Sequence, residues 1–256
     1  MGTQQDRGVM VVTGAARRLG RALALDFAQR GWRLALHVHD DDSEAQSLAR
    51  EISKAGGKAE IFAVDLADPR AVDGLLPVVT RRMGAVRCLI NNASVFEYDD
   101  IATVTAEGWD RHFAVNVKAP VFLAKSLATG LPAGADGVVI NIIDQRVWKP
   151  TPHFLSYAGS KAALWAMTQT LAQGLAPRVR VNAIGPGPML RSVHQTEADF
   201  AAQAAATPLQ RATSPEEIAA AIRFIIDAPA MTGQMIALDG GQHLAWQTPD
   251  IGDGRG

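Results

Sequence analysis

The sequence predicts an α/β fold in which helices cover both faces of a doubly wound, mostly parallel sheet of seven strands. Short runs rich in Val, Ile and Leu alternate with longer amphipathic stretches along the whole chain. This repeated alternation favours parallel strands joined by helical crossovers. A chain of 256 residues with 48% hydrophobic residues can bury one such core. The expected strands cover residues 9–14, 33–38, 59–65, 86–93, 137–144, 178–185 and 234–239.

Start and stop signals place helices between these strands. Asp68 and Ser214 each precede a proline, the pattern of a capping residue followed by proline at the first helical position. Gly31 and the pair Gly56–Gly57 follow apparent helices as C-caps, and Asp42 is a further N-cap candidate. We therefore expect residues 1–256 to form a single domain, with a core over 8–245 and a polar tail over 246–256. The long connection 188–213 is a candidate lid.

Composition excludes several classes of function. The formal net charge is −1, from 25 basic and 26 acidic residues, which argues against binding to nucleic acids or anionic membranes. Cys88 is the only cysteine, which rules out an internal disulfide and a multi-cysteine metal site, and it fits a reducing compartment. No apolar run reaches membrane-spanning length, and the N-terminus carries no signal segment. We expect a cytoplasmic protein without a metal.

Polar residues gather at the ends of the first four expected strands, where a doubly wound sheet binds its ligand. Each group alone is common turn chemistry, but four in succession predict a dinucleotide site. The groups are TGAARRLG (Thr13 to Gly20), His37-Val38-His39 followed by three aspartates at 40–42, Asp65-Leu66, and NNAS (Asn91 to Ser94).

Tyr157 and Lys161 form a candidate acid–base pair. They are four residues apart on an expected helix beginning near Phe154, so they share one face. A phenol ionises near pH 10, and a neighbouring ammonium group favours the phenolate. We expect Lys161 to lower the pKa of Tyr157 and suit it to proton transfer.

These motifs resemble those of the short-chain dehydrogenase/reductase family over residues 8–245. The family's T-G-x-x-x-G-x-G loop matches at Gly14 and Gly20, with Arg18 in place of the middle glycine. Further matches are Asn116, Tyr157-x-x-x-Lys161, the segment from Asn182 to Pro186 and Gly187, and Asp239-Gly-Gly. The resemblance implies a Rossmann-type domain, a lysine that also bonds the nicotinamide ribose, a water relay held by Asn116, and a homotetramer.

Asp144 is a departure from that family, which normally has a serine 12 to 13 residues before the tyrosine. An ionised carboxylate has no proton to donate and repels a developing oxyanion, so it suits ring nitrogens better than a ketone. The alternative is a strand-end cap.

With Asp144, the loop TGAARRLG, His37-Val38-His39 and N-A-S-x-F (Asn92 to Phe96), the chain is similar to pteridine reductases and bacterial dihydromonapterin reductases. That resemblance implies that Phe96 stacks on a pterin ring and that Ser94 contacts the ring or the cofactor. Phe96 as an ordinary loop hydrophobe is the alternative. Arg146, Trp148, Met189 and Leu190 are further candidates for the pocket wall.

Arg17, Arg18 and His39 favour a cofactor with a 2′-phosphate, so NADPH is expected. The carboxylates at 40–42 oppose this, and NADH is not excluded. The catalytic residues expected are Asp144, Tyr157, Lys161 and Asn116, and the substrate-binding residues are Ser94, Phe96, Asp144 and Tyr157. The cofactor-binding residues expected are Gly14, Arg17, Arg18, Leu19, Gly20, His37, His39, Asp65, Leu66, Asn92, Ala93, Ser94, Lys161, Pro186 and Gly187.

The sequence therefore predicts an NADPH-dependent reductase that transfers a hydride to a pteridine ring carbon and a proton to the adjacent nitrogen. A dihydropterin or a dihydrofolate-like molecule is the expected substrate. A carbonyl or 3-oxoacyl reductase of the same family is the nearest alternative. A non-catalytic protein that senses a dinucleotide is an alternative of another class.

Overall fold

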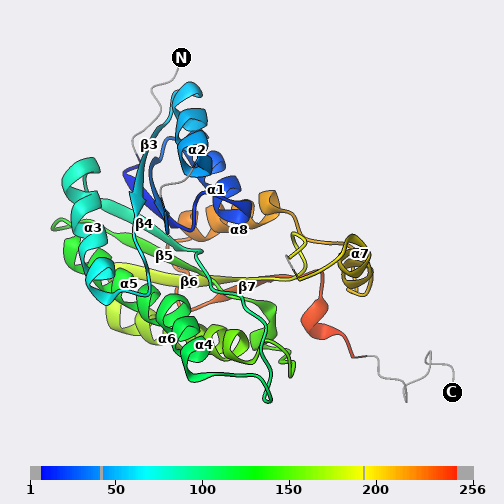
Figure 1. Cartoon of the computed structure of the whole chain (residues 1–256). Coiled ribbons are helices and arrows are strands. Elements are labelled where there is room, and N and C mark those ends of the chain that lie inside the picture. The colour runs from blue at the N-terminus through cyan, green and yellow to red at the C-terminus, as the bar shows by residue number, and fades with distance from the viewer. Residues whose placement is uncertain (1–6, 41–42, 193, 247–256) are drawn as a thin grey trace, which may run out of the picture.

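A parallel sheet of seven strands runs through the computed structural model, which describes residues 7–40, 43–192 and 194–246 (Figure 1). Its strand order is β3-β2-β1-β4-β5-β6-β7, and every neighbouring pair is parallel. The predicted fold class is confirmed. The strands are β1 (Val9–Thr13), β2 (Arg33–Val38), β3 (Lys58–Ala63), β4 (Val86–Asn91), β5 (Gly137–Ile142), β6 (Val179–Pro186) and β7 (Met235–Leu238).

Each strand begins within one residue of its predicted start, and most strands end one or two residues early. Asp65, Asn92 and Asp144 consequently lie beyond β3, β4 and β5, in loops rather than in strands. The strand register agrees with this placement, because each of these polar residues follows the last paired position of its strand. The polar groups therefore project from the carboxyl edge of the sheet.

Helices form a layer on each face of the sheet (Figure 1). The helices α1 (Arg18–Gln29), α2 (Ser43–Lys54) and α8 (Pro215–Asp227) cover one face, and α3 (Pro69–Met83), α5 (Ala119–Gly130) and α6 (Leu155–Leu175) cover the other. Side chains of β1 alternate between the two cores, with Met10 and Val12 in one and Val9 and Val11 in the other. Burial on both faces explains why β1 is almost purely apolar.

Local capping chemistry follows the sequence signals. The side chain of Asp68 accepts a hydrogen bond from the Arg70 N–H at 2.8 Å, and Ser214 forms a capping box with Glu217. Gly31 and Gly56 adopt positive φ values after α1 and α2. The expected N-cap Asp42 lies outside the described residues.

The sheet changes direction at β1, which has β2 on one side and β4 on the other. The crossover after β1 leads to β2 on one side, and the crossover after β3 leads back to β4 on the other side. A crevice therefore opens beyond the carboxyl ends of β1 and β4. The 188–213 connection leaves this edge after β6 and contains α7 (Glu197–Ala205), whose first turn is closed by a capping box between Thr196 and Asp199. Between β4 and β5, α4 (Ala106–Phe113) leads through a π-helical turn (Ala114–Lys118) into α5.

Within the described ranges, none of the helices is long and apolar enough to cross a membrane. The same part of the chain contains no group of three or more His, Cys, Asp or Glu side chains arranged to hold a metal ion. Cys88 is buried within β4.

Candidate active site

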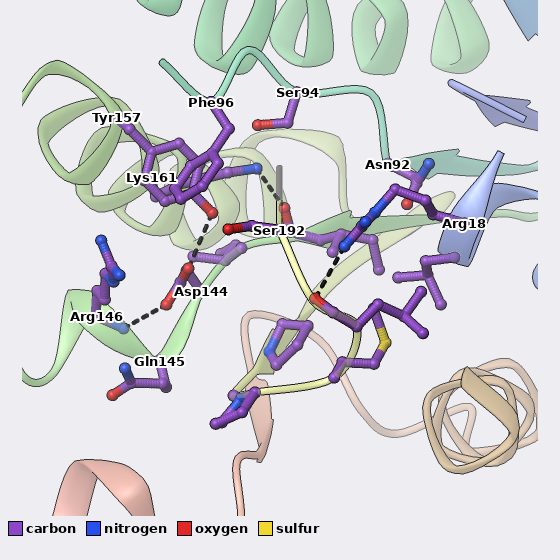
Figure 2. A pocket seen from close by; sticks show the side chains of 18 of the residues that line it. Arg18, Asn92, Ser94, Phe96, Asp144, Gln145, Arg146, Tyr157, Lys161 and Ser192 are labelled. Atoms are coloured by element: carbon purple, nitrogen blue, oxygen red, sulfur yellow. Dashed lines mark hydrogen bonds between the residues drawn. The ribbon is translucent and has the colours of Figure 1, made fainter. Parts of the chain in front are cut away.

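A cavity of about 660 Å³ lies at the carboxyl edge of the sheet. Figure 2 shows Arg18 and Asn92 on one side of it, and Tyr157, Phe96 and Asp144 on the other. The loops after β1, β4, β5 and β6 contribute to its wall, together with helix α6 and the 188–213 connection. Of the predicted site residues, those that line it are Gly14, Arg17, Arg18, Leu19, Gly20, Asn92, Ala93, Ser94, Phe96, Asp144, Tyr157, Lys161, Pro186 and Gly187.

The loop after β1 is shaped by two glycines. Gly14 has a φ of +63°, a conformation that favours glycine, and a Cβ there would lie 3.0 Å from the Ala93 Cα. A Cβ on Gly20 would lie 2.1 Å from the carbonyl oxygen of Gly14. The first turn of α1 can approach the strand end this closely only without a side chain. The result is a small cradle at a helix N-terminus, which is suited to phosphate.

A compact hydrogen-bond network joins the ends of β1 and β4. The hydroxyl of Thr13 accepts from the N–H groups of Asn92 and Ala93, both at 2.9 Å. The side-chain amide of Asn92 donates to the carbonyl oxygens of Thr13 at 2.8 Å and Gly14 at 3.1 Å. Thr13 is a site residue that the sequence analysis missed, although it begins the TGAARRLG motif. Its hydroxyl fixes the crevice at the switch point.

Arg18 stands where the family motif has its middle glycine, and it adopts a positive φ of +51°, in the left-handed region that favours glycine. Its guanidinium donates to the carbonyl oxygens of Arg191 at 2.7 Å and Leu190 at 3.0 Å, across the cavity mouth. Arg17 forms an exposed ion pair with Glu44 of α2. The loop therefore places two guanidinium groups at the cavity without closing its glycine cradle.

His37 requires a correction. It was expected to contact the cofactor, but its ring is 2% exposed and lies behind the loop. Its Nδ1 accepts from the Gly14 N–H at 3.2 Å, which leaves its Nε2–H to donate to the Val64 carbonyl at 3.0 Å. Burial lowers the pKa of His37 from 6.5 to about 4, so the ring is neutral at neutral pH. His37 is a positioning residue for the loop.

Three other predicted cofactor residues lie outside the cavity wall. His39 is exposed, with its ring 3.9 Å from the Asp40 carboxylate and 3.7 Å from that of Asp65. The Asp65 carboxylate also accepts from the Ala67 N–H at 2.8 Å. Leu66 is buried in the core beside α3. Their cofactor contacts stay predictions, and the carboxylates near His39 are the feature that opposes a 2′-phosphate there.

Asp144 and Tyr157 form a hydrogen-bonded pair at the opposite end of the cavity (Figure 2). The Tyr157 hydroxyl donates to Asp144 Oδ2 at 2.9 Å, and the other carboxylate oxygen accepts from the Arg146 N–H at 2.9 Å. The second contact caps the short 3₁₀ turn Gln145–Val147, so the capping alternative for Asp144 is present. Capping uses only one oxygen, and the other faces the phenol.

The electrostatics of this pair overturn one expectation. Lys161 was expected to lower the pKa of Tyr157, yet that pKa is raised well above 10 because the phenol is buried and faces the negative charge of Asp144. Burial also raises the pKa of Asp144, against the opposing effects of Arg146, Tyr157 and Lys161. The acid more easily deprotonated in this pair is consequently the carboxyl group of Asp144, not the phenol.

Lys161 lies beneath the pair on α6. Its Nζ donates to the Ile142 carbonyl at 2.8 Å and lies 5.6 Å from the centre of the Tyr157 ring. Burial lowers the pKa of Lys161 to about 8, although the Asp144 charge opposes the shift. The lysine is thus close to its titration point at neutral pH.

Asn116 is fully buried in the π-helical turn and does not line the cavity. Its amide donates to the Val95 carbonyl and the Ser160 hydroxyl, both at 3.0 Å, and its oxygen accepts from the Val95 N–H at 2.8 Å. These bonds hold the loop after β4 against α6. π-helical turns are frequent at functional sites, and this one makes Asn116 a positioning residue, while its predicted water relay stays a prediction.

Asp99 anchors the start of α6 and was missed by the sequence analysis. Its carboxylate accepts from the Ser156 N–H at 3.1 Å and from the Ser156 hydroxyl, and its carbonyl accepts from the Phe154 N–H at 2.8 Å. Ser156 directly precedes Tyr157, so Asp99 fixes the helix end that carries the phenol. The two partners lie 57 residues apart, and no local pattern links them.

Phe96 stacks on Phe154, with ring centres 4.4 Å apart and planes inclined by 7°. The Phe96 and Tyr157 rings form a T-shaped pair with centres 4.7 Å apart. Phe154 adopts a φ of +58°, a strained conformation that its surroundings must hold in place. The Phe96 side chain therefore forms an aromatic wall beside the acid pair. Its predicted stacking on a pterin ring stays a prediction.

Of the four further candidates for the cavity wall, three line the cavity and one does not. Arg146, Met189 and Leu190 line the cavity, as expected. Trp148 does not, because its ring turns outward and packs against His243 with centres 5.0 Å apart. Between β5 and the 188–213 connection, the cavity thus has the acid pair Asp144–Tyr157, the aromatic ring of Phe96 and the cation Arg146. Together these groups suit a flat, nitrogen-containing substrate.

Comparison with known proteins agrees with this arrangement. The family model described as Enoyl-(Acyl carrier protein) reductase matches residues 14–243. A short-chain type dehydrogenase/reductase of Picea abies is 30% identical, covering 91% of this chain and 92% of its own length. The crystal structure of FolM Alternative dihydrofolate reductase 1 from Brucella suis, in complex with NADP, superposes with a TM-score of 0.93. It is 48% identical and covers 96% of this chain and 99% of its own.

The angucycline C-6 ketoreductase LanV, solved with bound NADP, is more distant. Its TM-score is 0.84 at 29% identity, with 93% of this chain and 96% of its own covered. The chain is thus similar to reductases that act on more than one type of substrate. The family model and the Picea abies relative both indicate the same family of oxidoreductases. The chain belongs to the short-chain dehydrogenase/reductase family of oxidoreductases.

Proposed function

We propose that this enzyme is an NADPH-dependent reductase of dihydropteridines. The observation that carries the proposal is the hydrogen bond of 2.9 Å between Tyr157 and Asp144 at the cavity wall. The family's usual serine offers a ketone oxygen a permanent hydroxyl donor, whereas a carboxyl group donates only when it is protonated. A pteridine ring presents both N–H donors and basic nitrogens, which a carboxyl group can serve in either protonation state.

The likeness to the NADP-bound FolM structure supports both the cofactor and the substrate class. The residues present fit the cofactor, since the cradle between Gly14 and Gly20 excludes side chains and Arg17 and Arg18 supply positive charge beside it. Lys161 is the residue we expect to hold the nicotinamide ribose. When bound, NADPH supplies the hydride that reduces the carbon of a C=N bond in the ring.

The chain's own residues supply the proton. Burial raises the pKa of Asp144, so the carboxyl group takes up a proton more readily and can pass it to the ring nitrogen as the C=N electron pair moves there. The nitrogen gains one proton and Asp144 is left as a carboxylate. The Tyr157 hydroxyl stabilises that carboxylate through the existing hydrogen bond, and solvent protons restore the acid. Lys161 keeps a positive charge close to the pair.

Substitution of Asp144 tests the proposal. In Asp144→Asn the side chain keeps its shape but cannot donate an acidic proton, so kcat for dihydropterin reduction should fall by about 100-fold or more. Asp144→Ser restores the usual serine of the family and should favour ketone substrates over dihydropterins. NADPH binding, measured by fluorescence titration, should stay unchanged in both variants.

Unaltered dihydropterin turnover in both variants would refute the role assigned to Asp144. Efficient ketone reduction by the wild type, with no turnover of dihydropterins, would favour the carbonyl reductase alternative. A protein that binds NADPH but turns over neither class of substrate would favour the sensing alternative. Steady-state rates on a dihydropterin and a ketone panel distinguish the three results.

A further inference from the structure

Arg146 occupies an unusual place at the cavity wall. It follows Asp144 by two residues, on the 3₁₀ turn after β5. Its guanidinium lies over the ring of Phe154, with Cζ 5.0 Å from the ring centre, and the same ring stacks on Phe96. The cation is therefore held against the aromatic wall, in contact with the space where we expect substrate.

One buried nitrogen atom of the Arg146 guanidinium has no hydrogen-bond partner among the described residues. Nη1 of Arg146 is shielded from solvent, and no acceptor for it exists among the residues that the structure describes. Asp144 is close, but its carboxylate oxygens accept from the Arg146 main-chain N–H and from Tyr157. A buried donor of a charged group without an acceptor is costly, which indicates that the acceptor arrives with a bound molecule.

The other cations at the cavity have partners within the chain. Arg17 pairs with Glu44, Arg18 donates to the lid carbonyls, and Lys161 donates to the Ile142 carbonyl. Arg17 and Arg18 follow β1, whereas Arg146 follows β5, two strands away in the sheet. The strands β1 and β5 themselves are about 10 Å apart, two strand spacings. Arg146 is thus a cation at the chemical end, remote from the phosphate cradle.

We propose that Arg146, supported by Phe154, binds an anionic group on the side chain of the dihydropteridine substrate. The proposal rests on the proposed function and refines its substrate class to pterins whose side chain carries a carboxylate or a phosphate. Both groups match the planar fork of a guanidinium, which can donate two parallel hydrogen bonds to them. A neutral dihydroxypropyl side chain offers no such partner.

The test compares three substrates in wild-type enzyme, Arg146→Gln and Arg146→Lys. Dihydrofolate carries carboxylates, dihydroneopterin monophosphate carries a phosphate, and dihydrobiopterin has a neutral side chain. In Arg146→Gln we expect KM to rise by about tenfold or more for at least one of the two acidic substrates, since a charged hydrogen bond is lost. KM for dihydrobiopterin should stay within about twofold, since its side chain carries no anionic group for Arg146 to bind. Arg146→Lys should keep part of the preference, because charge remains but the fork is lost.

Arg82→Gln is a matched control. Arg82 also lies over a phenylalanine, with Cζ 4.9 Å from the centre of Phe62, but on α3 and outside the cavity wall. Its removal should leave all three KM values unchanged. A binding measurement gives a second readout: calorimetric titration of NADP⁺-loaded enzyme with folate and with biopterin, at low and high salt. Salt should weaken folate binding to the wild type more than to Arg146→Gln.

Two results would overturn the subsite. An equal fall in kcat for all three substrates would mean that Arg146 acts through Asp144 and Tyr157 instead, and no change in any parameter would mean that it binds no substrate group. The dihydrofolate and dihydroneopterin phosphate arms separate the two anions. If the wild type reduces no dihydropterin, the proposed function fails, and the calorimetric comparison then decides the subsite by itself.

Discussion

The two ends of the cavity are built in different ways. At the end formed by β1 and β4, Gly14 and Gly20 leave room, and the side chains of Thr13 and Asn92 bond to main-chain groups and hold the strand ends together. At the other end, side chains from separate loops meet, with Tyr157 on α6 bonded to Asp144 after β5. The first end is fixed by backbone geometry, whereas the second can be retuned by single substitutions.

The largest effect is expected from Tyr157→Phe, which breaks the chemical end alone. The change removes the hydroxyl that donates to Asp144 Oδ2. We expect kcat for dihydropterin reduction to fall by about 100-fold to 1,000-fold, the range typical for loss of one donor that stabilises developing negative charge. The dissociation constant for NADPH should stay unchanged, as measured by fluorescence titration. A weakened affinity for NADPH would show that the two ends are not independent.

Gly20→Ala is the corresponding change at the other end. The added Cβ would lie 2.1 Å from the Gly14 carbonyl oxygen, so the loop must shift. We expect NADPH affinity to fall by about 100-fold, with the free energy of unfolding reduced by about 2 kcal/mol. Gly74→Ala in α3 is the control, because its Cβ meets no atom within 4 Å. That variant should gain about 0.5–1 kcal/mol, and a similar loss in both variants would contradict the steric argument.

The buried His37 makes the β1 end sensitive to acid. Its pKa is about 4 in the folded protein against 6.5 for the ordinary group, so the unfolded chain takes up a proton first as the pH falls. Its contribution to stability is complete above pH 6.5 and falls by about 3 kcal/mol as the pH drops towards 4. Urea denaturation between pH 7.5 and 4.5 should show this loss, and it should be smaller in His37→Gln. The exposed His153→Gln should behave as the wild type does.

The smallest effect concerns the cofactor's 2′-phosphate. Glu44 pairs with Arg17 and brings a carboxylate close to the expected phosphate site. Glu44→Gln removes that charge while keeping the side-chain length. The ratio of kcat/KM with NADPH to that with NADH should rise by up to about fivefold, in line with the modest strength of exposed ion pairs. A fall in the ratio would mean that Glu44 orients Arg17 for the phosphate.

Much of the fold followed from local pattern. Apolar runs located the strand starts because residues covered on both faces must be apolar, and Asp68 and Ser214 marked helix starts because their side chains satisfy the first N–H groups. The cavity wall was predictable to the same extent, since the residues after β1, β4 and β5 share one edge of the sheet. The motifs predicted that Tyr157, Lys161 and Asp144 share a site, and the three residues line the same cavity.

What escaped prediction depends on contacts distant in sequence. His37 looked like a cofactor ligand because its motif ends a strand, but its ring is buried between Gly14 and Val64, whereas His39 lies beyond the end of β2 and is exposed. Asp99 reaches Ser156 across 57 residues, which no periodicity records. The raised pKa of Tyr157 depends on how deeply the ring is buried and on its pairing with Asp144, and both are tertiary properties.

The bond from Arg18 to the lid has a consequence for how this enzyme can evolve. Its acceptors are the main-chain carbonyls of Leu190 and Arg191, which every amino acid possesses. Side chains along that stretch can therefore be exchanged without losing the anchor that sets its path. Arg18, in place of a glycine, therefore lets the side chains of the 188–213 connection change while its main chain stays anchored at Leu190 and Arg191.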